Sequence, residues 1–321
     1  MNTGELSGLF SFTVSHIKAE LIILEFLNVH CASCQAQTPV MNKVYELINE
    51  NDHLREKVKI MGVCPGNNFR EISKFKKEKA IQFPCIPDTD FEAYETVGEC
   101  GTPFFIMVRK SKNKDIVTWS HRGQISSPYY FVQEAWDSLK ADQQSIAQKS
   151  REKGSLKVIT EKPGPFISDE EMEKKIYAAM ESRRLQLDEL KKISLGNGKE
   201  IYMGKVKTDD STKLYFSKLI SRPSVCDLCH AVHFILTFDE QGFVVNFIPI
   251  HLTKFENVEW EIAEIMKTRK KLVGKSILKP IPFDPEVDAV SLATMTSALI
   301  FNSVERAERD YRELRRQGYI P

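Results

Sequence analysis

The chain of 321 residues lacks any apolar run of about eighteen residues, the length that a transmembrane helix needs, so we expect no membrane span. It also lacks an excess of charge, because 45 Lys and Arg residues stand against 44 Asp and Glu residues and leave a net charge of +1. This balance argues against binding to nucleic acid or to an acidic membrane surface. The first 20 residues lack a basic start, a long apolar stretch and a small-residue cleavage site, so we expect no export signal in the sequence as written.

Cysteine is scarce as well, since seven cysteines in a chain of this length exclude a disulfide-stapled mini-domain. Four of the seven form two C-x-x-C pairs, Cys31 with Cys34 and Cys226 with Cys229. A hydrophobic content of 42% and a charged content of 28% are typical of a globular chain whose halves can each bury a core. The two cysteine pairs are therefore the first place to look for chemistry.

Residues 1–140 alternate between strand and helix patterns. A buried strand, "ELIILEF", precedes a helix over about 33–50, and the strand "KVKIMGV" precedes the amphipathic helix "NFREISKFKKEKA". Two further strands, "PFFIMVRK" and "DIVTWSH", come before a last helix, "PYYFVQEAWDSLK". This alternation predicts an α/β domain with a mostly parallel sheet and helices on both faces.

Residues 141–167 are polar and charged, end in Pro-Gly-Pro, and are interpreted as a linker. The second domain, 168–321, is predicted to be α+β. It opens with a long helix, "SDEEMEKKIYAAMESRRLQLDELKKI", whose first turn is acidic and whose end is basic. Strands follow, including two apolar runs around "DEQG" that predict a hairpin, and the chain from about 291 to 317 is predicted to be helical.

The first cysteine pair follows a buried strand and opens a helix in "LEFLNVHCASCQAQTP". The free N–H groups and the dipole of a helix N-terminus stabilise a thiolate, which lowers the pKa of the first cysteine. Cys34, one turn further on, can then resolve a mixed disulfide formed by Cys31. We therefore expect Cys31 to react with alkylating agents faster than buried thiols do.

This region resembles the thioredoxin fold, in particular its exported thiol-disulfide oxidoreductase and redoxin branch. The cysteine pair lies at the strand-to-helix junction, Pro39 has the family's spacing, and "GTPFFIMV" supplies Thr102-Pro103 where the family has a cis-proline. Glu25, six residues before Cys31, matches the buried acid that relays a proton to the resolving cysteine. The resemblance implies catalytic roles for Cys31, Cys34, Glu25, Thr102 and Pro103.

Three other interpretations of the first pair remain open: a structural zinc site, a redox-inactive domain, and a peroxidase. Zinc needs a second ligand pair nearby, and the peroxidase pattern has a proline upstream of its cysteine that this sequence lacks. Of the remaining cysteines, Cys64 is predicted to be core, Cys85 to lie in a loop without a partner, and Cys100 to lie near Cys31.

The second domain resembles the FMN-binding domain of quinone-reductase electron-transfer subunits. In that family an Asp-x-x-Ser/Thr-Gly-Ala-Thr motif carries FMN as a phosphoester on its last threonine. The matching positions here, within "VDAVSLATMTSALIF", are Asp288, Ser291, Ala293 and Thr294. Leu292 replaces the motif's glycine, so the domain is either covalently flavinylated on Thr294 or a flavin-free relative; an ordinary helix start capped by Ser291 is the simpler alternative.

The second cysteine pair lies in "SVCDLCHAVH" and has three interpretations. With His230 as an axial ligand, and His233 or His251 on the other face, Cys226 and Cys229 would attach haem c. Zinc would need further ligands beside the pair. A dithiol or disulfide needs only the two cysteines and could exchange electrons with the first pair, and we favour this interpretation.

The sequence thus predicts a thiol-disulfide oxidoreductase or redox electron-transfer protein. Its partner would be a protein thiol, a disulfide or an electron-transfer protein, and its location would be outside the cytoplasm, although the sequence shows no signal peptide. One alternative is an electron-transfer protein that carries flavin or haem c and uses the first domain for docking. Another is a redox-inactive assembly protein.

Overall fold

The computed structural model describes residues 17–111, 115–140, 167–180, 186–195, 199–207, 211–225, 231–254 and 258–320. The chain divides into two compact units. Among the described residues, the first unit holds those up to Lys140 together with Val225, and the second unit holds the others. The linker predicted over 141–167 lies almost entirely outside the described residues.

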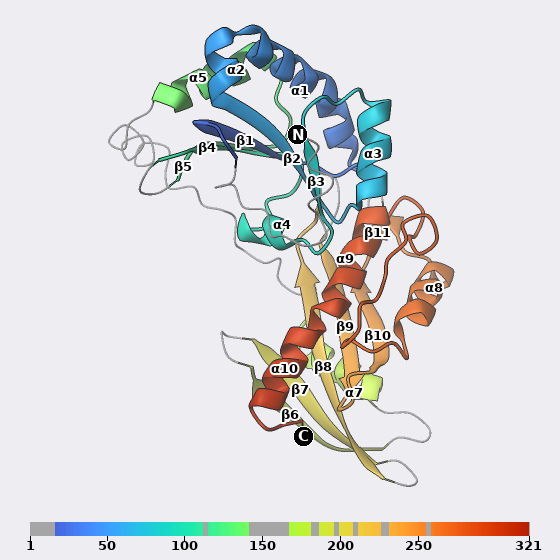
Figure 1. Cartoon of the computed structure of the whole chain (residues 1–321). Helices are drawn as coiled ribbons and strands as arrows, with labels where there is room; N and C mark the ends of the chain where they lie inside the picture. Colours follow the sequence, from blue (N-terminus) through green and yellow to red (C-terminus); the bar gives the residue numbers. More distant parts are fainter. Residues whose placement is uncertain are drawn as a thin grey trace. The chain divides into compact units, whose positions relative to one another are not determined.

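The first unit is built around a five-stranded sheet in the order β3-β2-β1-β4-β5. In Figure 1, α1, α2 and α5 lie on one side of this sheet and α4 on the other. The elements in chain order are β1 (Leu21–Phe26), α1 (Ala32–Glu50), α2 (Asp52–Lys57), β2 (Val58–Pro65), α3 (Phe69–Glu78), β3 (Cys85–Asp88), α4 (Glu92–Thr96), β4 (Phe104–Arg109), β5 (Ile116–Arg122) and α5 (Pro128–Lys140).

The central strand β1 is buried along its whole length, as its unbroken apolar run predicts. It pairs in parallel with β2 and antiparallel with β4, and β4 pairs antiparallel with β5. The sheet is therefore mixed, with β1, β2 and β3 parallel, and not mostly parallel as the alternation predicted. The short connection between β4 and β5 can join only antiparallel neighbours, and β4 itself runs antiparallel to β1.

The second unit contains a five-stranded antiparallel sheet in the order β10-β9-β8-β7-β6. Its elements are α7 (Asp169–Met180), β6 (Gln186–Ser194), β7 (Glu200–Lys207), β8 (Thr212–Arg222), β9 (Val232–Asp239), β10 (Val244–His251), β11 (Thr253–Lys254), β12 (Val258–Glu259), α8 (Ile262–Leu272), α9 (Thr294–Glu305) and α10 (Ala307–Arg316). The hairpin predicted around "DEQG" is present as β9 and β10.

Alternate residues of β8 face opposite layers of the second unit. Tyr215 packs in the cluster that α7 forms with Met172 and Ile176, whereas Lys218, on the other face, forms an ion pair with Asp310 of α10. Figure 1 shows α9 and α10 running across the sheet. The period of two along the strand thus produces a layered α+β unit with a core on each face of the sheet.

The long helix predicted from Ser168 is wrong in its second half. Helix α7 ends at Met180, and Gln186–Ser194 forms strand β6. Leu187 and Ile193 are buried and Leu190 is half-buried, so apolar residues recur every three positions as in a helix, and a bulge shifts the register of β6 after Leu187. Pairing with β7 then places Glu189 within 2.7 Å of Lys205, an ion pair that the helical prediction could not anticipate.

The C-terminal helical region is also divided, because α9 ends at Glu305 and α10 begins at Ala307. Ala293 is the N-cap residue of α9, so the alternative in which Ser291 is the N-cap is wrong. Within the described residues, no helix is long and apolar enough to cross a membrane.

Candidate active site around Cys31 and Cys34

Cys31 is the N-cap residue of α1, at the end of the loop that follows β1. Its backbone is extended, with φ −81° and ψ 118°, and its sulfur accepts a hydrogen bond from the Cys34 N–H at 3.3 Å. The thiol therefore occupies the place of an oxygen in an ordinary N-cap. The helix that it caps buries Cys34, Thr38 and Met41 at intervals of three and four residues, which fixes the first turn against the sheet.

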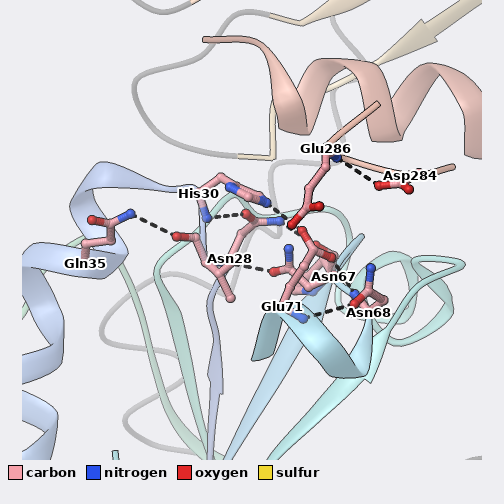
Figure 2. Close-up of polar contacts among 10 residues, drawn as sticks. Asn28, His30, Gln35, Asn67, Asn68, Glu71, Asp284 and Glu286 are labelled. Atoms are coloured by element: carbon pink, nitrogen blue, oxygen red, sulfur yellow. Dashed lines mark hydrogen bonds and ion pairs between the residues drawn. The ribbon is translucent and has the colours of Figure 1, made fainter. Parts of the chain in front are cut away.

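The loop before Cys31 is held by a polar network that Figure 2 shows. Asn28 donates from Nδ2 to the Pro65 carbonyl at 2.6 Å, and its Oδ1 accepts the His30 N–H at 2.9 Å. Asn67 accepts the Val29 N–H at 3.0 Å, and His30 Nε2 lies 2.6 Å from Glu71 Oε1. The loop is thus anchored to the end of β2 and the start of α3.

The sequence interpretation missed these anchoring residues. One signal was available, because Asn68 and Glu71 stand at capping-box spacing and form that box in the structure. The helix start places Glu71 where its carboxylate can reach His30. Asn28 carries no comparable signal, because an asparagine in a loop is common in any sequence.

Thr102 and Pro103 directly precede β4, and the peptide bond between them is cis, as the resemblance implied. The Cys31 thiol donates to the Thr102 carbonyl at 3.6 Å. The Thr102 side chain also forms a hydrogen bond with Cys34. The structure therefore brings Cys31, Cys34 and Thr102 together, as predicted from residues far apart in the sequence.

Cys34 is buried, and burial raises the pKa of its thiol well above the usual range. The hydrogen bond with Cys31 raises the pKa further, whereas the Thr102 side chain and the Asn28 backbone lower it. A thiol with a raised pKa stays protonated until a base removes its proton. This behaviour fits a resolving cysteine, which must stay inactive until a mixed disulfide has formed.

Glu25 lies in β1 and is only 2% exposed. Burial raises the pKa of its carboxyl group well above the usual value, and the negative potentials of Cys85 and Cys31 raise it further. Gly62, its neighbour on β2, makes room for this cluster, because a Cβ there would lie 2.7 Å from the Cys85 sulfur. Glu25 therefore holds a proton more strongly than an exposed carboxyl group does, and it lies among thiols.

The other cysteines of the first unit differ partly from the sequence interpretation. Cys64 is buried core, as predicted, but Cys85 is not a partnerless loop residue, since it begins β3 and forms a hydrogen bond with Cys64. That bond and burial raise the pKa of Cys64 well above the usual range. Cys100 is half-buried and donates to the Val97 carbonyl at 2.8 Å.

The motif residues of the second unit lie on one loop and the first turn of α9. Asp288 is buried, forms an ion pair with Lys271 at 2.6 Å and accepts the Asp284 N–H at 2.9 Å. Burial opposes the charge of Asp288, but these two hydrogen bonds outweigh it and lower the pKa of the carboxyl group. Ser291 is exposed, and Thr294 begins α9.

The cavity beside Asp288 does not include the other polar residues of the motif. This cavity of about 340 Å³ is lined by Lys271, Lys275 and Lys279, but neither Thr294 nor Ser291 lines it. The Asp288 carboxylate is already engaged by Lys271. Covalent FMN on Thr294 stays a prediction of the resemblance.

Leu292 occupies the place of the motif's glycine and has φ 60°, in the left-handed region that favours glycine. Its side chain is 70% exposed, so little packing would be lost on its removal. Leu292→Gly should therefore raise the free energy of unfolding of the second unit by about 1 kcal/mol. Val287→Gly is the control, because Val287 is also exposed but lies outside that region, and its replacement should lower stability. Calorimetry of the full-length variants measures both; equal destabilisation would contradict this account of Leu292.

Cys226, Cys229 and His230 lie outside the described residues, so their haem, zinc and disulfide interpretations stay predictions. Of the nearby histidines, His233 is buried and its Nδ1 lies 2.9 Å from the Ser221 hydroxyl. Burial, and then the charge of His251, lower the pKa of His233 to about 4. The described residues contain no group of three or more His, Cys, Asp or Glu side chains that could hold a metal ion.

No protein-family model matches the chain, and no curated protein matches it. Among solved structures, it is similar to StoA from Bacillus subtilis, with 18% identity and a TM-score of 0.32 over 38% of this chain and 86% of that one. A secreted Mycobacterium tuberculosis disulfide oxidoreductase homologous to E. coli DsbE has 16% identity and a TM-score of 0.33, over 39% of this chain and 87% of that one. A thiol-disulfide isomerase from Corynebacterium glutamicum has 16% identity and a TM-score of 0.33, over 42% and 90%.

The similarity covers the N-terminal part of the chain. The first unit has a thioredoxin-like fold, with the Cys31–Cys34 pair at the start of α1 and a cis-proline before β4. The prediction of that fold is confirmed. These structures do not match the FMN-binding-like fold predicted for the second unit. The strands and helices of that unit confirm only its predicted α+β class.

Proposed function

We propose that this protein is a thiol-disulfide oxidoreductase that exchanges electrons with the thiols or disulfides of proteins. The observation that carries the proposal is the position of Cys31 as the N-cap of α1, with its sulfur accepting the Cys34 N–H. A helix N-terminus stabilises a thiolate at that place, and the thiolate is the species that attacks a disulfide.

The exchange has two steps. The Cys31 thiolate attacks one sulfur of a substrate disulfide, which forms a mixed disulfide and releases the other substrate sulfur as a thiolate. Cys34 then loses its proton and attacks Cys31, which releases the second substrate thiolate and leaves a Cys31–Cys34 disulfide. Two electrons pass to the substrate, and the reverse sequence oxidises a substrate dithiol.

Glu25 is the group to which we assign the proton of Cys34. The Glu25 carboxyl group is buried with a raised pKa, so it holds a proton more strongly than an ordinary acid does, and the buried Cys34 thiol keeps its proton until a base removes it. A positioned carboxylate can serve as that base. The Thr102-Pro103 segment forms the other wall of the site, where its carbonyl meets the Cys31 thiol.

We place the protein outside the cytoplasm, where disulfides persist. The M. tuberculosis protein of similar fold is described as secreted, which supports this location. Neither a flavin-carrying nor a haem-carrying function is favoured by an observation on the described residues. An assembly role without redox chemistry is distinguished by the experiment that follows.

A trapping experiment tests the proposed function. A full-length variant with serine at Cys34, Cys226 and Cys229, treated with oxidised glutathione, should accumulate a stable glutathione adduct on Cys31, because no resolving thiol remains. Restoring Cys34 should release the glutathione and leave a Cys31–Cys34 disulfide. Peptide mass mapping locates the adduct; glutathione on Cys64, Cys85 or Cys100 with none on Cys31 would contradict the proposal.

A further inference from the structure

The cavity beside Asp288 in the second unit takes no part in the proposed thiol chemistry. It has a volume of about 340 Å³ and is lined by residues from the end of α8, from the loop that follows α8 and from α9. Pockets that bind small organic molecules have volumes from about 300 Å³ upward. The cavity is therefore large enough for a small ligand.

The loop that forms most of the cavity wall is fixed by hydrogen bonds at both ends. At its start, the Gly274 N–H donates to the Val244 carbonyl at 2.8 Å, and the Val244 N–H donates to the Lys275 carbonyl at 2.8 Å. At its end, the Ile281 N–H donates to the Glu305 carboxylate at 2.6 Å. The wall is thus preformed, so a ligand need not order it on binding.

The charged groups that line the cavity are three lysines and one carboxylate. Lys271 forms an ion pair with Asp288 at 2.6 Å, so these two charges offset each other. Lys275 and Lys279 are exposed, and neither forms an ion pair with a residue that the structure describes. The lining therefore has two positive charges in excess, which favour a negatively charged ligand.

The remainder of the wall is mainly apolar. Ile281 and Phe301 are buried, with 6% and 2% of their surface exposed, and Pro280 and Pro282 stand on either side of Ile281. The ring of Phe301 packs against that of Phe283, with 5.1 Å between the ring centres. Such a wall favours the transfer of hydrocarbon out of water. A ligand that fills the cavity should therefore have an apolar part beside its charged group.

We propose that this cavity binds a small amphiphilic anion, with its carboxylate or phosphate group at the two exposed lysines and its hydrocarbon part against the apolar wall. Lysine binds either kind of oxyanion as a point charge, so both belong to the proposed class. Asp288 limits the affinity, because its carboxylate repels the anion and engages Lys271. The site is separate from Thr294, which does not line the cavity, and binding is independent of the disulfide exchange assigned to the first unit.

Calorimetric titration of the full-length protein tests the two parts of the ligand separately. Octanoate and octyl phosphate carry both a charged group and a hydrocarbon chain, acetate and inorganic phosphate carry the charge alone, and octanol carries the chain alone. We expect the two chain-bearing anions to bind at least about tenfold more tightly than the other three compounds. If only one of the two binds, the site stands and its charged group is identified as a carboxylate or a phosphate.

Two double variants locate the binding site. Lys275→Gln with Lys279→Gln removes the two charges without acidic partners and should weaken the binding of the chain-bearing anions by about tenfold or more. Lys191→Gln with Lys213→Gln is the matched control, because both lysines are exposed on strands of the same unit and do not line the cavity. It removes the same net charge and should leave the affinity within about twofold.

Asp288→Asn should change the affinity in the opposite direction. It removes the negative charge and releases Lys271, while the asparagine oxygen can still accept the Asp284 N–H, so binding should tighten by about threefold to tenfold. Circular dichroism shows whether each variant is folded, and a gain in affinity cannot result from unfolding.

Four results would each overturn the proposed anion site. They are no binding of either chain-bearing anion up to about 1 mM, affinities for octanol, acetate or inorganic phosphate that equal theirs, equal losses in the two double variants, and weaker binding by folded Asp288→Asn protein.

Discussion

Replacement of Cys31 with serine should abolish disulfide exchange, with a fall in rate of about 10³-fold or more toward the uncatalysed background. The reason is chemical, because a serine hydroxyl at this N-cap remains protonated and cannot form a disulfide. Reduction of oxidised glutathione by the dithiol form of the full-length protein, followed by the mass of the protein, gives the rate.

Cys100→Ser is the matched control for this prediction. Cys100 also belongs to the first unit, but it is half-buried, donates to the Val97 carbonyl and is not part of the C-x-x-C pair. Its replacement should leave exchange within about twofold of the parent protein. Equal losses in the two variants would mean that serine disrupts the fold, and an unchanged rate in Cys31→Ser would remove Cys31 from the mechanism.

Replacement of Glu25 with glutamine should have two effects of opposite sign. Exchange should slow by about 10²-fold, because the buried base that takes the Cys34 proton is lost. The first unit should become more stable at neutral and alkaline pH, because glutamine keeps the shape of the side chain without a buried charge.

The pH dependence of stability gives the sign of the Glu25 effect. Because burial raises the pKa of Glu25 above its usual value of 4.5, the folded state keeps a proton that the unfolded state loses. The free energy of unfolding should therefore fall as the pH rises from 4.5 toward the pKa of the folded state, by at most about 1.4 kcal/mol per pH unit. Glu25→Gln should remove this slope.

Native-state hydrogen exchange of peptides from β1 and β2 measures the stability of the first unit within the full-length protein. Glu56→Gln is the control, because Glu56 is exposed on α2 and its removal should leave the slope unchanged. If the free energy of unfolding still falls with pH in Glu25→Gln, groups other than Glu25 cause the fall. An unchanged rate of disulfide exchange in Glu25→Gln would show that Cys34 loses its proton by another route.

The first unit could be predicted from its sequence where local signals agree with the final packing. The apolar run of β1, the cysteine at the start of α1 and the proline before β4 each mark an element, and the structure has all three. The chemistry of these residues follows from their places on the elements. A pattern that spans one strand and one helix is thus sufficient to locate the cysteine pair.

The remaining features depend on contacts between distant residues, which the sequence does not mark. Gln186–Ser194 has the spacing of a helix, but pairing with β7 and a bulge make it a strand. Cys85 forms a hydrogen bond with Cys64 only because β2 and β3 are paired in the sheet. The hydrogen bond of Thr102 with Val225 joins residues 123 positions apart and could not be read from either segment. Tertiary contacts override local preference at each of these places.

The central claim is that Cys31 and Cys34 form one redox couple, and a redox titration of the full-length protein tests it most directly. The protein is equilibrated with graded ratios of reduced and oxidised dithiothreitol, quenched with an alkylating agent and mapped by peptide mass. We expect Cys31 and Cys34 to gain and lose alkylation together along one two-electron curve, with a Cys31–Cys34 disulfide at the oxidised end. Alkylation of both cysteines at every ratio, or a disulfide that joins either of them to Cys64 or Cys85 instead, would contradict the account.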